Sequence, residues 1–85
     1  MPTVSMFYGI IIRMFYNDHL PPHFHAEYSG QKVVYDFSGK EIEGKLPPVQ
    51  RHLVQAWVDL HKAELEANWE LAKDREELFR IEPLR

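Results

Sequence analysis

The feature that most constrains the fold is a change of hydrophobic periodicity at Leu46-Pro47-Pro48. Before these residues, β-favouring side chains occur in short runs that are separated by glycine or proline, which is typical of strands and turns. After them, apolar residues recur at three- and four-residue steps over residues 48–74, which is typical of an amphipathic helix. A proline is well tolerated in the first turn of a helix. The chain is therefore predicted to have an α+β fold, with strands first and helix second.

The first half contains four predicted strands, over residues 4–16, 23–28, 31–37 and 40–45. Gly9 interrupts the first strand, where we expect a bulge or kink. Ser29-Gly30 and Ser38-Gly39 provide the short spacing of hairpin turns. Residues 78–82 alternate apolar and charged side chains before Pro83, so they form either a short strand or a frayed end. These patterns predict an antiparallel sheet of four strands, or of five if residues 78–82 join it.

Residues 48–74 are predicted to form one long helix or two shorter helices that are broken near His61. This C-terminal helix or helix pair should pack on one face of the sheet. The face that we expect it to cover is the uninterrupted apolar side of the first strand, namely Met6, Tyr8, Ile10, Ile12 and Met14.

Length and composition exclude several classes of protein. A chain of 85 residues is expected to form one domain, residues 1–85, and its 45% of hydrophobic residues is typical of a globular protein. The absence of cysteine excludes a disulfide scaffold and a thiol nucleophile. A net charge of −3 argues against binding nucleic acid through bulk charge. No apolar run is long enough to span a membrane and no signal peptide is evident, so we expect a cytoplasmic protein without a membrane partner.

The second face of the predicted sheet mixes apolar and polar side chains. Its apolar members are Phe7, Ile11 and Phe15 of the first strand and Val34 of the third. Contiguous apolar surface of this kind is uncommon on a monomer and usually marks a contact site. We therefore interpret these four residues as partner-binding residues, either for a homodimer or for another protein.

A His-x-His-x-Glu pattern places His23, His25 and Glu27 on that same face. Two imidazoles can act as a general acid and a general base, and Arg13 can stabilise an anion beside them. These four residues are the candidate catalytic residues of a small metal-free ribonuclease. The sequence leaves open whether the protein is an enzyme.

Metal binding by the same three residues is disfavoured by their spacing. A straight strand separates the Cα atoms of His23 and Glu27 by about 13 Å, which is long for ligands of one ion. A bulge, or a ligand from elsewhere such as His19, would be required. The four glycines stand singly, so the sequence has no phosphate loop or dinucleotide fingerprint either. We therefore expect neither a metal ion nor a cofactor, and no stabilisation by zinc.

Four segments together resemble the domain of unknown function 4160 family of small prokaryotic proteins. They are MPTVSMFYGIIIRMFYNDHLPPHFHAEY, GKEIEGKLPP, WVDLHKAELEANWELA and RIEPLR. The most specific part runs from Asp18 to Tyr28, and the proline-histidine motif of the family falls on Pro21, Pro22, His23 and His25. The resemblance implies similarity to toxins of type II toxin–antitoxin pairs, encoded beside a small protein that can carry a helix-turn-helix DNA-binding domain. It supplies no established catalytic residue.

The sequence as a whole predicts a toxin-like component of a prokaryotic type II toxin–antitoxin module, which binds its cognate antitoxin through the mixed face of the sheet. Two alternatives remain. One is the metal-free ribonuclease, for which RNA would be a partner. The other is a non-enzymatic module that forms a homodimer or higher homo-oligomer.

Overall fold

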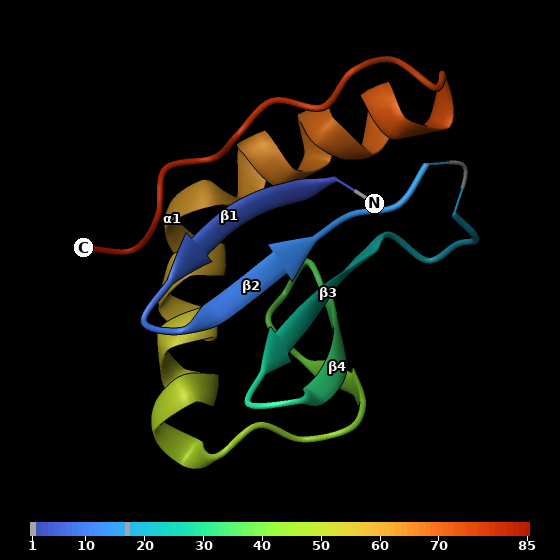
Figure 1. Ribbon diagram of the computed structural model, residues 1–85. Helices are drawn as coiled ribbons and strands as arrows, with labels where there is room; N and C mark the ends of the chain where they lie inside the picture. The colour runs from blue at the N-terminus through green and yellow to red at the C-terminus, as the bar shows by residue number, and fades with distance from the viewer. Residues whose placement is uncertain (1, 17) are drawn as a thin grey trace.

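The computed structural model describes residues 2–16 and 18–85, and it shows five strands followed by one helix (Figure 1). The strands are β1 (Thr3–Phe7), β2 (Ile10–Arg13), β3 (His23–Tyr28), β4 (Gln31–Asp36) and β5 (Glu41–Glu43), and the helix is α1 (Pro48–Lys73). All neighbours are antiparallel and the strand order follows the chain, β1-β2-β3-β4-β5. The predicted α+β fold, an antiparallel sheet with a C-terminal helix on one face, is confirmed.

The N-terminal segment differs from the prediction, because residues 4–16 form a hairpin and not one strand with a bulge. Tyr8 and Gly9 connect β1 to β2, with φ values of 49° and 78°. Two successive residues with positive φ are typical of the tight turn whose twist matches that of the flanking strands. The sequence hides this turn because tyrosine is a residue typical of strands.

The hairpin changes which side chains enter the core. Phe7 lies opposite Ile10 in the register, and residues that are paired across two strands point to the same face. Phe7 is therefore buried with Ile10 and Ile12, and its ring lies 5.4 Å from the ring of Trp57. Met6 and Tyr8 are exposed. The prediction that Met6 and Tyr8 pack under the helix is wrong, as is the placement of Phe7 on the partner-binding face.

The remaining strands lie close to their predicted positions. β3 coincides with residues 23–28, β4 ends one residue before Phe37, and β5 is shorter than residues 40–45.

Residues 78–82 form no strand, although they lie beside β1. The backbone N–H of Ile81 donates a hydrogen bond of 2.7 Å to the carbonyl of Val4, and the Ile81 side chain is buried. Figure 1 shows the C-terminal segment, in red, running back along α1. The fifth strand therefore comes from the N-terminal hairpin and not from the C-terminal segment.

The helical region is one helix with a kink. His61 has non-helical dihedral angles (φ −126°, ψ 24°) inside α1, at the position where the sequence left open a break. The buried side of α1 faces the sheet and consists of Val54, Trp57, Val58, Leu65, Asn68, Trp69 and Ala72. The helix covers one face of the sheet, and we call the opposite side the open face. In the part of the chain that the structure describes, no helix is long and apolar enough to cross a membrane.

Candidate functional site

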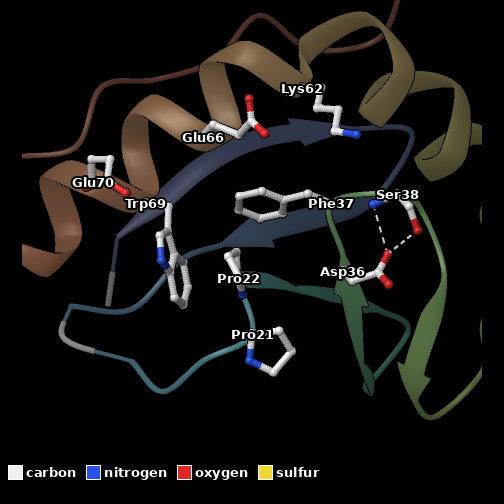
Figure 2. A pocket seen from close by; sticks show the side chains of 9 residues that line it. All are labelled: Pro21, Pro22, Asp36, Phe37, Ser38, Lys62, Glu66, Trp69 and Glu70. Atoms are coloured by element: carbon white, nitrogen blue, oxygen red, sulfur yellow. Dashed lines mark hydrogen bonds between the residues drawn. The ribbon is translucent and has the colours of Figure 1, made fainter.

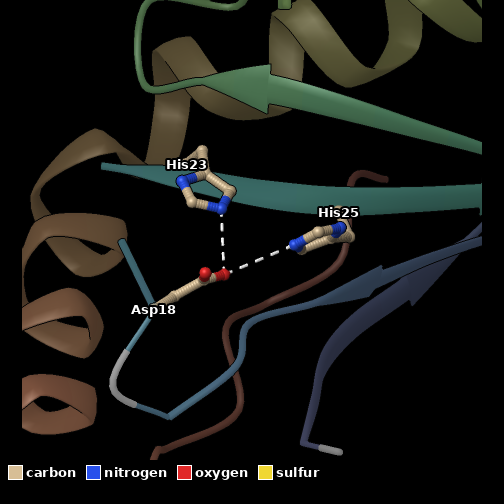
Figure 3. A group of neighbouring side chains, drawn as sticks. All are labelled: Asp18, His23 and His25. Carbon is tan, nitrogen blue, oxygen red and sulfur yellow. Dashed lines mark ion pairs between the residues drawn. The ribbon is translucent and has the colours of Figure 1, made fainter. Parts of the chain in front are cut away.

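The candidate site lies at the start of β3, where the loop that follows β2 returns to the sheet. His23 and His25 are two residues apart on β3, so their side chains lie on the same side of the strand. Asp18 reaches them from the loop, and all three side chains converge (Figure 3). One ligand atom from each lies within 4.8 Å of the others.

The contacts of His23 fix the orientation of its ring. Nδ1 lies 2.7 Å from the carbonyl oxygen of Pro21, and Nε2 lies 2.9 Å from Oδ2 of Asp18. The side chain is only 4% exposed, and its ring centre is 5.4 Å from that of Trp69. The ring is therefore held between a backbone acceptor and a carboxylate, with little freedom to rotate.

His25 points toward the same carboxylate from the next position on the face. Its Nε2 atom is 3.5 Å from Oδ2 of Asp18. This nitrogen is buried, and it has no hydrogen-bond partner among the residues that the structure describes. The rest of the side chain is 32% exposed, and the ring of Phe15 packs edge-on against it. Of the two imidazoles, His25 is the one that a molecule in solution can reach.

The electrostatics of the cluster favour a charged Asp18 and a neutral His25. Burial raises the pKa of Asp18, but the hydrogen bond from the His19 backbone and the nearby imidazoles outweigh it, so the pKa lies below its ordinary value. Burial lowers the pKa of His25 below its ordinary value, and the neighbouring His23 adds to this, although Asp18 opposes it. At neutral pH the cluster therefore offers an ionised carboxylate and an unprotonated imidazole.

Arg13 and Glu27, the other two candidate catalytic residues, form a separate ion pair. Arg13 Nη1 lies 3.0 Å from Glu27 Oε1, and both side chains are partly exposed. Arg13 is directly opposite His25 in the β2–β3 register, so the pair adjoins the histidine cluster. The carboxylate that approaches both imidazoles is Asp18, which the sequence did not single out, while Glu27 lies on the same face of β3 and pairs with Arg13.

The register also determines which predicted partner-binding residues reach the open face. Ile11 and Val34 lie there and are partly exposed, and Phe15 flanks them beside His25, whereas Phe7 is buried in the core. The sequence missed Met6, which pairs with Ile11 and is 52% exposed.

In the described part of the chain, three cavities adjoin the site, and the smallest, of about 40 Å³, is lined by Arg13, Phe15, His25, Ala26, Glu27 and Lys32. A cavity of about 150 Å³ opens beside the histidines and is lined by Asp18, His19, Pro21, His23, His25, Val34, Ile42 and Glu43. A larger one of about 500 Å³ lies on the other side of the proline pair (Figure 2). It is lined by Pro21, Pro22, Asp36, Phe37, Ser38, Lys62, Glu66, Trp69 and Glu70. Only the cavity of about 150 Å³, among the described residues, is lined by all three clustered side chains, so a molecule that reaches the cluster would bind there.

A comparison with models of protein families gives a match. The model of the domain of unknown function DUF4160 matches residues 9–70, which contain the whole cluster and most of α1. Neither a curated protein nor a solved structure matches the chain significantly.

Proposed function

We propose that this chain, which belongs to the DUF4160 family of domains of unknown function, is the toxin-like component of a prokaryotic two-protein module. In this proposal the open face of the sheet binds the cognate antitoxin. The observation that supports it most directly is the contrast between the two faces of the sheet. One face is covered by α1, and the other carries apolar side chains that no described element covers completely.

The composition of the open face suits a protein interface. Met6 and Ile42 are 52% and 44% exposed, and Ile11 and Val34 lie partly exposed between them. The same face also carries charged side chains, which lie beside these apolar residues on neighbouring strands, namely Arg13, Glu27, Lys32 and Glu43. Apolar contact area combined with polar groups that select the partner is the usual anatomy of a specific interface. The charged groups would also exclude partners of the wrong charge pattern.

The experiment is co-expression with the protein encoded by the adjacent gene, followed by co-purification and affinity measurement. The informative variants are Met6→Glu and Ile11→Glu, which place a carboxylate on the apolar part of this face and leave the histidine cluster intact. We expect each to weaken the complex at least tenfold, since each would bury an unpaired charge at the interface. Leu60→Glu is the matched control, because Leu60 is a 68% exposed residue of α1.

The outcomes separate the alternatives. Full retention of the complex by both variants would remove the open face from the interface. A stable dimer of the isolated chain in light scattering, lost in Ile11→Glu, would favour the homodimeric module. Growth inhibition on induction that the partner relieves supports the toxin role, and its loss in His25→Ala would favour the ribonuclease.

A further inference from the structure

We propose that Asp18, His23 and His25 form a binding site for one late first-row divalent transition-metal ion, such as zinc. The site opens into the cavity of about 150 Å³ on the open face. From the sequence we expected no metal ion, because the strand offers only His23, His25 and Glu27 as ligands. Asp18 provides the carboxylate, so the long span from His23 to Glu27 no longer applies.

The hydrogen bond from His23 to the backbone fixes which ring nitrogen faces Asp18. The carbonyl of Pro21 can only accept a hydrogen bond, so Nδ1 of His23 carries a proton. In a neutral imidazole, Nε2 then presents its lone pair, and this atom faces the Asp18 carboxylate at 2.9 Å. Two acceptors at this distance require a cation between them or a second proton on the ring. A ring N–H held by a backbone carbonyl is also the usual support for a metal-binding histidine.

A simple ion pair between Asp18 and His23 leaves the position of His25 unexplained. Its Nε2 atom is buried and approaches the same carboxylate oxygen at 3.5 Å, with no hydrogen-bond partner among the described residues. An orphaned buried nitrogen has a cost that a hydrogen bond or a metal bond removes. One ion placed among the three atoms would engage both imidazoles and the carboxylate together.

The distances between the three ligand atoms are close to those around one ion. With ligand bonds of about 2.1 Å, the ligands of a tetrahedral ion lie about 3.4 Å apart. The two pairs that include Asp18 lie at 2.9 and 3.5 Å, and the third pair lies within 4.8 Å. The backbone N–H of His19 donates to Oδ1 of Asp18 at 2.9 Å, which leaves Oδ2 directed at the imidazoles. Binding of one ion would bring the nitrogens of His23 and His25 closer together.

The donor set identifies the class of metal. Two imidazoles and one carboxylate suit zinc, iron(II) and their neighbours, whereas magnesium and calcium prefer oxygen ligands alone. Three protein ligands leave at least one position for water or substrate, as in catalytic metal sites. Glu43 and His19 line the same cavity and can supply a further ligand.

The test is titration of the full chain, stripped with a chelator and dialysed, with zinc sulfate in a calorimeter and in thermal denaturation. We expect one zinc ion per chain and a rise in melting temperature of several degrees, because a ligand that binds only the folded state stabilises it. Magnesium chloride should give no shift. His25→Ala and Asp18→Asn should each weaken zinc binding at least tenfold.

His52→Ala is the matched control, because His52 is an exposed histidine on α1 and should bind nothing. His25 is partly exposed, so its variant should fold, and circular dichroism checks this. Absence of zinc binding at one ion per chain would overturn the proposal. So would zinc binding that is unchanged in both His25→Ala and Asp18→Asn, or that His52→Ala weakens equally.

Discussion

Asn68 shows how much a single buried polar residue contributes to this fold. Its side-chain amide donates to the carbonyl of Phe79 at 3.0 Å and accepts from the N–H of the same residue at 3.1 Å. It is fully buried and joins α1 to the C-terminal segment. We expect Asn68→Ala to lower the free energy of unfolding by roughly 2 kcal/mol, since both backbone groups lose their partner. Urea denaturation measures it.

Gln55→Ala is the control, because Gln55 makes one hydrogen bond, to the carbonyl of Gly39, from a partly exposed position. Its cost should be about 1 kcal/mol or less. Equal costs for the two variants would show that Asn68 does not hold the segment.

At the same scale, the candidate site was only half predictable. Alternation along a strand placed His23 and His25 on one side correctly, because that rule needs no knowledge of the rest of the chain. The same rule added Glu27, whose actual partner Arg13 comes from the neighbouring strand. Asp18 was missed because its position depends on how the loop closes. The position of Asp18 could have been predicted from the antiparallel pairing of β2 and β3. This pairing brings the residues of the connecting loop close to the start of β3.

At the scale of elements, the N-terminal hairpin depends on its two-residue turn. Gly9 has φ of +78°, a region where a side chain costs about 1 to 2 kcal/mol. A Cβ there would meet the Tyr28 ring at 3.6 Å, an ordinary contact, so the cost of Gly9→Ala should come from the backbone alone. We expect Gly9→Ala to lower the melting temperature by several degrees. Gly30→Ala, in the turn between β3 and β4 with φ of +84° and open space around it, should do the same. A neutral Gly9→Ala beside a costly Gly30→Ala would contradict the β1–β2 hairpin.

Hairpins whose turn consists of two turn-forming residues were predicted correctly. Ser29-Gly30 correctly predicted the turn between β3 and β4. Tyr8-Gly9 lies inside a run of residues that favour strands, so the turn between β1 and β2 was not predicted. Residues 78–82 have an alternating pattern but form a single backbone hydrogen bond with β1, from Ile81 to Val4. An alternating pattern indicates which side chains can be buried. It does not indicate whether a neighbouring strand forms backbone hydrogen bonds with the segment.

At the scale of the whole molecule, one helix covers one face of the sheet, so the proposed interface and the proposed metal site share the other. The apolar pair Met6 and Ile11 lies on β1 and β2, while the metal ligands lie on β3 and the loop before it. Arg13 and Glu27 lie between the two regions. A partner bound across the open face would therefore restrict access to His25. Antitoxin binding and access to the metal site are coupled by this arrangement if both proposals hold.

The whole molecule should also lose stability at both ends of the pH scale, because the pKa values of Tyr35 and Asp36 are shifted in opposite directions by folding. Burial raises the pKa of Tyr35, and its hydrogen bond of 2.7 Å to Glu41 adds to this, with only slight opposition from Arg51. Because the pKa is higher in the folded state, the contribution of Tyr35 is fully present below the unfolded value of about 10 and is lost as the pH rises further.

Asp36 behaves in the opposite way. Burial raises the pKa of Asp36, but the hydrogen bonds from Ser38 and Lys40 lower it by more, so the pKa lies below its ordinary value. The contribution of Asp36 to the free energy of unfolding is therefore lost as the pH falls below about 4.

We therefore expect the free energy of unfolding of the wild-type chain to decline between pH 9 and pH 11, about the unfolded pKa of tyrosine. Tyr35→Phe should be less stable at neutral pH, because it loses the hydrogen bond to Glu41, but it should decline less steeply over this range. Tyr16→Phe changes an exposed tyrosine and should retain the wild-type slope. Urea denaturation of the three proteins at several pH values gives the slopes. Parallel declines in wild type and Tyr35→Phe would show that burial of Tyr35 does not limit the alkaline stability of the fold.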